Sequence, residues 1–138
     1  MTQHPNQALN AYRQVGLAGH VASGETSPHT VIQLLMDGAL DRISTARSAM
    51  AHRDLMRKAQ VIPEAIRIID GLRIHLDHER GGELAGNLAA LYDYMSRRLI
   101  DANMNDDPQA LDEVSGLLGE IKAGWDAIAP AAADGQGL

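Results

Sequence analysis

Residues 81–103 read GGELAGNLAALYDYMSRRLIDAN. On a helix, the apolar side chains of this stretch recur at steps of three and four and gather on one face. That face consists of Leu84, Leu88, Leu91, Tyr92, Met95, Leu99 and Ala102. Two glycines precede it, and Asn103 stands at a suitable place for a C-terminal cap. The pattern predicts a long helix that places one face in a core, with Ile100 projecting away from that face.

Three other stretches carry the same three-four spacing. The first begins at Ser27-Pro28, a pair typical of a helix start because serine caps the helix and proline fits its first turn. The second runs over residues 55–78 and contains Pro63, which predicts a kink near residues 60–62 or a break with a restart. The third begins at Asp107-Pro108 and ends before Pro130.

The composition favours helices packed on helices. The chain has 138 residues, a length typical of one domain, and it contains one Trp, three Tyr and no Phe. An aliphatic core of this kind suits helices better than strands, which are rich in β-branched and aromatic residues. We therefore predict an all-α fold, an antiparallel four-helix bundle over residues 27–130. A short, weakly held helical segment (residues 1–26) precedes the bundle, and a disordered tail (residues 131–138) follows it.

Several classes of function are disfavoured by composition. The chain has no cysteine, so disulfides and thiolate chemistry are excluded. A net charge of −6 argues against nucleic-acid binding, which needs clustered basic residues. No apolar run approaches the ~20 residues that span a bilayer, and the first residues do not form a secretory signal. The sequence predicts a soluble protein that is not inserted in a membrane and remains in the cytoplasm.

Candidate reactive groups are few. His75, Asp77, His78 and Glu79 have spacings that would let one helix present them to a metal, but a solvated helix end is the favoured interpretation because no third strong ligand is indicated nearby. The neighbouring carboxylates disfavour a histidine phosphotransfer site, the main alternative for a bundle, because they would repel a phosphoryl group. No spacing marks a nucleophile with its base or a phosphate-binding loop. We expect no catalytic residue, no metal and no cofactor.

Five blocks of residues, in order along residues 8–130, form a further pattern. They are Ala11-Tyr12-Arg13-Gln14-Val15; Ser27-Pro28-His29 with residues 34–38; Ile68-Ile69-Asp70; Gly81-Gly82-Glu83, Asn87-Leu88, Leu91 to Met95 and Arg97-Arg98-Leu99; and Glu113-Val114, Gly116-Leu117-Leu118 and Trp125. Together they resemble the flagellar secretion chaperone family FliS, and the tyrosine-rich block makes the resemblance specific. Pro63 departs from the family, whose members carry an ordinary helix former there.

The resemblance implies a cytoplasmic export chaperone. Such a protein holds the disordered C-terminal segment of flagellin, prevents premature polymerisation and delivers its client to the components of the type III export gate. The client wraps the bundle and forms short helices in apolar grooves, a mode that suits a tail with exposed apolar stripes. The free protein is expected to be a monomer or homodimer. A helical adaptor with another client remains an alternative.

The resemblance also suggests which residues meet the client. Leu9 and Tyr12 match positions that cover part of the binding surface in the free state and are displaced. Ile100 and Leu117 lie at or beyond the edges of their apolar faces and are candidates for groove lining, although scattered surface apolar residues are common. The predicted partner-binding set is Leu9, Tyr12, Leu88, Tyr92, Met95, Leu99, Ile100 and Leu117. For Arg97 and Arg98, structural roles are favoured over contact with a partner.

Overall fold

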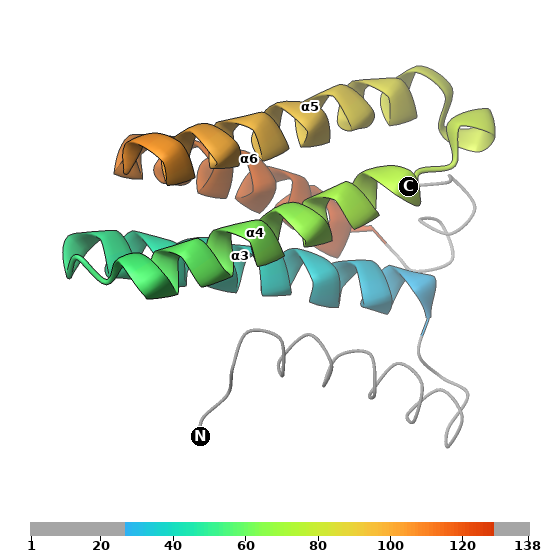
Figure 1. Cartoon of the computed structure of the whole chain (residues 1–138). Coiled ribbons are helices and arrows are strands. Elements are labelled where there is room, and N and C mark those ends of the chain that lie inside the picture. The colour runs from blue at the N-terminus through green and yellow to red at the C-terminus, as the bar shows by residue number, and fades with distance from the viewer. Residues whose placement is uncertain (1–26, 129–138) are drawn as a thin grey trace.

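A computed structural model describes residues 27–128. Within this range all regular secondary structure is α-helical. The described helices are α3 (Pro28–Ala51), α4 (Leu55–Ile74), α5 (His78–Asn105) and α6 (Pro108–Asp126). Links of two or three residues join them, so successive helices run in opposite directions (Figure 1). Helix α3 packs against α4 and α6, and α5 packs against the same two helices. The predicted all-α, four-helix bundle is confirmed. The predicted segments at residues 1–26 and 131–138 lie outside the described residues.

The helices begin where the sequence predicts. The Ser27 hydroxyl accepts a hydrogen bond from the Thr30 N–H at 3.1 Å, and Pro28 occupies the first turn. Asp107 caps α6 in the same way, because its carboxylate accepts from the N–H groups of Gln109 and Ala110. Such side-chain caps replace hydrogen bonds that the first turn of a helix cannot make for itself.

Two helix ends differ from the prediction. Helix α4 stops at Ile74, not near residue 78, because Asp77 begins the next helix by accepting from the Arg80 N–H at 3.1 Å. Helix α5 continues past Asn103 to Asn105 and ends at Asp106, which adopts the left-handed conformation. The apolar periodicity could not mark these ends, since both are determined by polar residues outside the apolar face.

The predicted glycine turn is a single sharp change of direction inside α5. Gly82 has φ 52° and ψ −127°, whereas the residues on either side are helical. This combination of φ and ψ lies outside the left-handed helical region and is readily adopted only by glycine, so Gly82 allows one turn at His78–Gly81 to precede the main body of the helix. The long helix predicted for residues 81–103 is therefore the part of α5 beyond this change of direction.

Pro63 does not break α4. The helix is uninterrupted from Leu55 to Ile74, so the break with a restart is wrong (Figure 1). Proline lacks an N–H and cannot bond the carbonyl of Ala59, four residues earlier. Ala59 is exposed, so water can take the place of the missing donor.

The core is aliphatic, as predicted. Its fully buried large side chains come from all described helices and are Met36, Ile62, Ile69, Met95, Leu99, Leu111, Leu118, Val61 and Val114. Tyr92 and Trp125 add the aromatic side chains of the described core. The predicted face of α5 is only partly enclosed, because Leu84 and Leu91 remain 49% and 36% exposed while Ala85 takes a buried position. Helix α5 thus has a buried carboxyl-terminal half and a more open amino-terminal half.

Candidate partner-binding surface

The predicted binding residues of α5 fall into two groups. Tyr92, Met95 and Leu99 lie on the inner face and are between 0% and 3% exposed, so they form core in this state. Burial raises the pKa of Tyr92 to about 12, because the apolar surroundings disfavour a phenolate. Leu88 is partly buried against the core, whereas Ile100 is 45% exposed. Among the predicted partner-binding residues of α5, Ile100 is therefore exposed and Leu88 is partly exposed, whereas the other three are buried.

Helix α5 also carries apolar side chains at the surface that the prediction did not include. Met104 lies one turn beyond Ile100 and is 76% exposed. Leu84 and Leu91 are exposed nearer the amino end of the helix. Such side chains are ordinary one at a time. Ile100 and Met104 lie on the same side of the helix and form a short apolar stripe, whereas Leu84 and Leu91 lie on the opposite side. The sequence pattern did not mark them, because Leu84 and Leu91 belong to the face predicted to be buried and Met104 follows the predicted end of the helix.

Helix α6 contributes Leu117, which is partly buried and packs against the core. Ile121 of the same helix and Ile128, just beyond its end, are likewise partly buried. Leu9 and Tyr12 lie outside the described residues. The roles of all eight predicted residues in partner binding remain predictions.

The polar residues of the tyrosine-rich block join α5 to α6. The Tyr94 hydroxyl donates to Glu113 Oε2 at 2.7 Å, and Arg98 Nε donates to Glu113 Oε1 at 2.8 Å. These two donors stabilise the carboxylate and lower the pKa of Glu113. The same hydrogen bond raises the pKa of Tyr94, and Glu113 raises the pKa of Arg98. Arg97 instead pairs with Asp93 on its own helix. Arg98 therefore has the structural role that the sequence favoured.

A second polar contact holds α3 against the far end of α6. His29 Nε2–H donates to the Trp125 carbonyl at 2.9 Å, and Trp125 Nε1–H donates to the His29 carbonyl at 3.0 Å. The two rings stack, with centroids 4.9 Å apart and planes inclined by 16°. Sequence reasoning noted both residues and missed their contact, because 96 positions separate them.

Buried charges lie between α4 and its neighbours. Arg42 of α3 donates to Glu64 of α4 at 3.2 Å, and the side chains are 3% and 2% exposed. Arg42 also donates to the Gly38 carbonyl at 3.0 Å. Lys58 of α4 reaches the end of α5, where it donates to the Asn103 carbonyl at 2.9 Å and to Asp106. These pairs join α4 to α3 and to the end of α5, and no sequence pattern indicated them.

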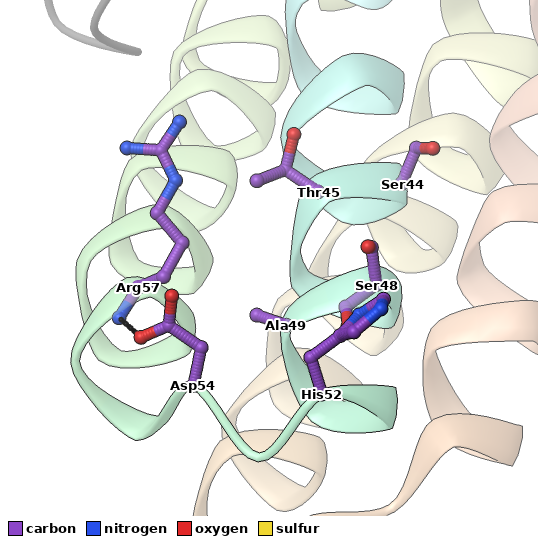
Figure 2. A pocket seen from close by; sticks show the side chains of 7 residues that line it. All are labelled: Ser44, Thr45, Ser48, Ala49, His52, Asp54 and Arg57. Carbon is purple, nitrogen blue, oxygen red and sulfur yellow. Dashed lines mark hydrogen bonds between the residues drawn. The ribbon is translucent and has the colours of Figure 1, made fainter.

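A polar pocket opens between α3 and α4 beside their link. Figure 2 shows Ser44, Thr45 and Ser48 on α3, with His52 and Asp54 in the link and Arg57 on α4. His52 Nδ1–H donates to the Ser48 carbonyl at 2.9 Å, and Asp54 caps α4 by accepting from the Arg57 N–H at 3.1 Å. Both groups are thus engaged by the local backbone. The pocket offers hydroxyl and guanidinium donors rather than an assembled nucleophile and base.

The predicted His-rich group is divided between two helices. His75 follows the last residue of α4, and its Nδ1–H donates to the Gly71 carbonyl at 2.8 Å. Asp77 is engaged as the cap of α5, and His78 begins that helix. The premise that one helix presents these side chains together is therefore wrong. Within residues 27–128 no group of three or more His, Asp or Glu side chains is arranged to hold a metal ion.

The fold and these contacts define a helical-bundle protein with exposed apolar side chains on α5. None of the helices among the described residues combines the length and apolar character needed to cross a membrane.

Comparison with known proteins gives the family. The family model described as "Flagellar protein FliS" matches residues 8–132. A flagellar secretion chaperone FliSB of Pseudomonas aeruginosa is 51% identical over 122 residues, covering 88% of this chain and 95% of that protein. The flagellar secretion chaperone FliS of Salmonella typhimurium is 46% identical, covering 90% and 91%. The FliS of Bacillus subtilis is 34% identical, covering 72% and 73%. The chain belongs to the FliS family of flagellar secretion chaperones, which confirms the resemblance.

Proposed function

We propose that this protein binds the C-terminal segment of flagellin in the cytoplasm. Binding prevents premature polymerisation and keeps the subunit competent for type III export, where components of the export gate receive it. The observation that carries the proposal is the similarity, over nearly the whole chain, to proteins named flagellar secretion chaperones. The protein acts by covering a polypeptide and performs no chemical step. In the absence of client it is a monomer or homodimer.

The exposed apolar side chains of α5 support this role. Ile100 and Met104 present an aliphatic and a flexible thioether side chain to the surface, one helical turn apart. An amphipathic client segment can place its apolar face on such a stripe. Met side chains adapt readily to different partner shapes, which suits a segment that folds on binding.

A calorimetric titration with a synthetic peptide of the flagellin C-terminal segment tests the proposal. We expect a dissociation constant in the micromolar range or tighter and a negative heat-capacity change, because binding buries apolar surface. The absence of both a heat signal and co-elution would contradict the proposal.

Leu9 and Tyr12 are proposed to cover part of the binding surface until the client displaces them. Replacing Tyr12 with alanine then removes a competitor for the surface. We expect Tyr12→Ala to bind the peptide more tightly or faster, measured by the same titration and by stopped-flow fluorescence. Unchanged affinity and rate would argue against a covering segment while leaving client binding itself intact.

A further inference from the structure

Within residues 27–128, the arginines of α4 differ from the basic side chains of the other helices in having no carboxylate partner, whereas Lys58 of α4 pairs with Asp106. Within residues 27–128, every Lys and Arg of α3, α5 and α6 has a carboxylate within 4.0 Å. In the same range, the basic residues without such a carboxylate are Arg53, Arg57, Arg67 and Arg73. They lie on α4 or in the link before it. On a chain of net charge −6, this local concentration of uncompensated positive charge is distinctive.

The outward face of α4 places one of these charges, Arg67, among apolar side chains. Met56, Pro63, Arg67 and Ile74 follow one another at helical spacings of seven, four and seven residues, so they share one face. Met56 is 86% exposed and Ile74 is 69% exposed. Arg67 is exposed between them. The face thus combines apolar contact area with positive charge.

Two further arginines that have no carboxylate partner within the described range flank this face toward the two ends of α4. Arg57 Nη1 donates to Gln60 Oε1 of the same helix at 3.5 Å. Arg57 lines the pocket beside α3, where Figure 2 shows its guanidinium group across from Thr45. Arg73 lies about 24 Å further along the helix axis, from the rise of 1.5 Å per residue. Its Nε–H is enclosed and has no acceptor among the described residues. An enclosed donor is costly unless an acceptor is supplied.

The chemistry of the face indicates what it can take. A second copy placed on it through α4 would bring arginines against arginines, which is unfavourable. An anionic membrane would be repelled by the net charge of −6, whereas a narrow peptide responds mainly to charges within a Debye length of about 8 Å. The exposed Met56 and Ile74 favour a ligand with apolar side chains as well as carboxylates. An acidic amphipathic polypeptide segment meets all of these conditions.

We propose that the outward face of α4 is a second contact surface for the client, which takes a flagellin segment bearing Asp or Glu beside apolar residues. This inference rests on the proposed function. The segment extends along α4 from the α3–α4 link toward Ile74. Its carboxylates pair with Arg67 on this face and with Arg57 and Arg73, which flank it, and its apolar side chains pack on Met56 and Ile74.

A matched pair of charge reversals tests the surface. The first variant carries Arg57→Glu and Arg67→Glu on α4. The control carries Arg47→Glu and Arg80→Glu, which change the net charge equally at arginines already paired with Asp112 and Asp77. Purified full-length flagellin from the same organism is titrated into each at about 50 mM and about 500 mM NaCl. Thermal unfolding of both variants is recorded alongside.

At low salt we expect the α4 variant to bind about tenfold more weakly than the wild type, and the control to change less than about threefold, because only the α4 arginines pair with the client. The difference should shrink at high salt as charges are screened. Equal weakening in both variants, or none in the α4 variant, would overturn the inference while wild-type binding upheld the proposed function. Absence of wild-type binding would overturn both.

A second test, which does not depend on charge reversal, measures whether bound flagellin protects the same face from chemical labelling. The chain has no cysteine, so Gln60→Cys introduces a single thiol between Met56 and Arg67. We expect saturating flagellin to slow maleimide labelling of this thiol at least fivefold. An unchanged labelling rate in a complex shown by gel filtration to be formed would overturn the proposed location.

Discussion

Helices α4 and α5 lie against each other but differ in whether their arginines have carboxylate partners. The arginines of α5 pair with carboxylates on the same or neighbouring elements, as Arg97 does with Asp93 and Arg98 with Glu113. On α4, Glu64 and Lys58 are consumed in buried or partly buried pairs, while Arg57 and Arg67 have no carboxylate partner among the described residues. Arginines that look alike in the sequence can therefore have different roles in the folded chain. Paired charges hold helices together, whereas unpaired ones remain available to a partner.

The two helices also differ in how they expose apolar residues. On α5 the exposed Ile100 directly follows the fully buried Leu99, so one residue step separates core from surface. On α4 the most exposed apolar side chains, Met56 and Ile74, stand near the two ends of the helix with charge between them. We therefore assign α5 a mainly apolar contact surface and α4 a mixed one.

The largest expected effect comes from the buried pair that joins α4 to α3. Glu64→Ala leaves Arg42 buried without its carboxylate, and we expect a loss of about 3–5 kcal/mol in the free energy of unfolding. Urea denaturation followed by circular dichroism measures it. The double variant Arg42→Met with Glu64→Leu removes both charges and should recover most of the loss. A single variant as stable as the wild type would show that the pair is not structural.

Two adjacent residues of α5 allow the effect of a core substitution to be compared directly with that of a surface substitution. Leu99→Ala should lower the free energy of unfolding by about 2–5 kcal/mol, because it opens a cavity in the core. Ile100→Ser should leave stability within about 0.5 kcal/mol of wild type and weaken binding of the flagellin peptide severalfold. Urea denaturation and calorimetry separate the two effects. If Leu99→Ala weakened peptide binding and Ile100→Ser did not, the client would have to contact side chains that are buried in the client-free structure.

The smallest effect concerns the contact between α5 and α6. The pKa of Glu113 is lower in the folded chain than its ordinary value of 4.5, because Tyr94 and Arg98 stabilise its carboxylate. Its contribution to stability is therefore present above about pH 4.5 and is lost as the pH falls through the folded pKa. Thermal unfolding between pH 3 and pH 7 should show a steeper loss on acidification in the wild type than in Glu113→Gln. Parallel curves would show that Glu113 contributes nothing to the pH dependence.

Local chemistry made much of the fold predictable. Ser27-Pro28 and Asp107-Pro108 predict the starts of α3 and α6, because capping depends on residues near in sequence. The carboxyl end of α4 was misplaced because the cap at Asp77 belongs to the next helix. Pro63 was expected to disturb α4, yet the exposed position of Ala59 lets the helix continue. Both errors arose because the outcome depends on the neighbouring residues in the fold and not on the type of the residue alone.

The contacts between helices were less predictable. The apolar period identifies Leu99 as core and Ile100 as surface without reference to any other helix. The pairing of Arg42 with Glu64, and the stacking of His29 on Trp125, depends on how helices are rotated against each other. Single-sequence patterns carry no information on that rotation. For the same reason, the unpaired arginines of α4 became evident only once every other pair had been located.

Gel filtration of the chain mixed with monomeric flagellin, intact or lacking its C-terminal segment, tests the central claim most directly. The account predicts a stable complex with intact flagellin and separate elution with the truncated form. Equal complex formation with both forms, or none with either, would contradict it.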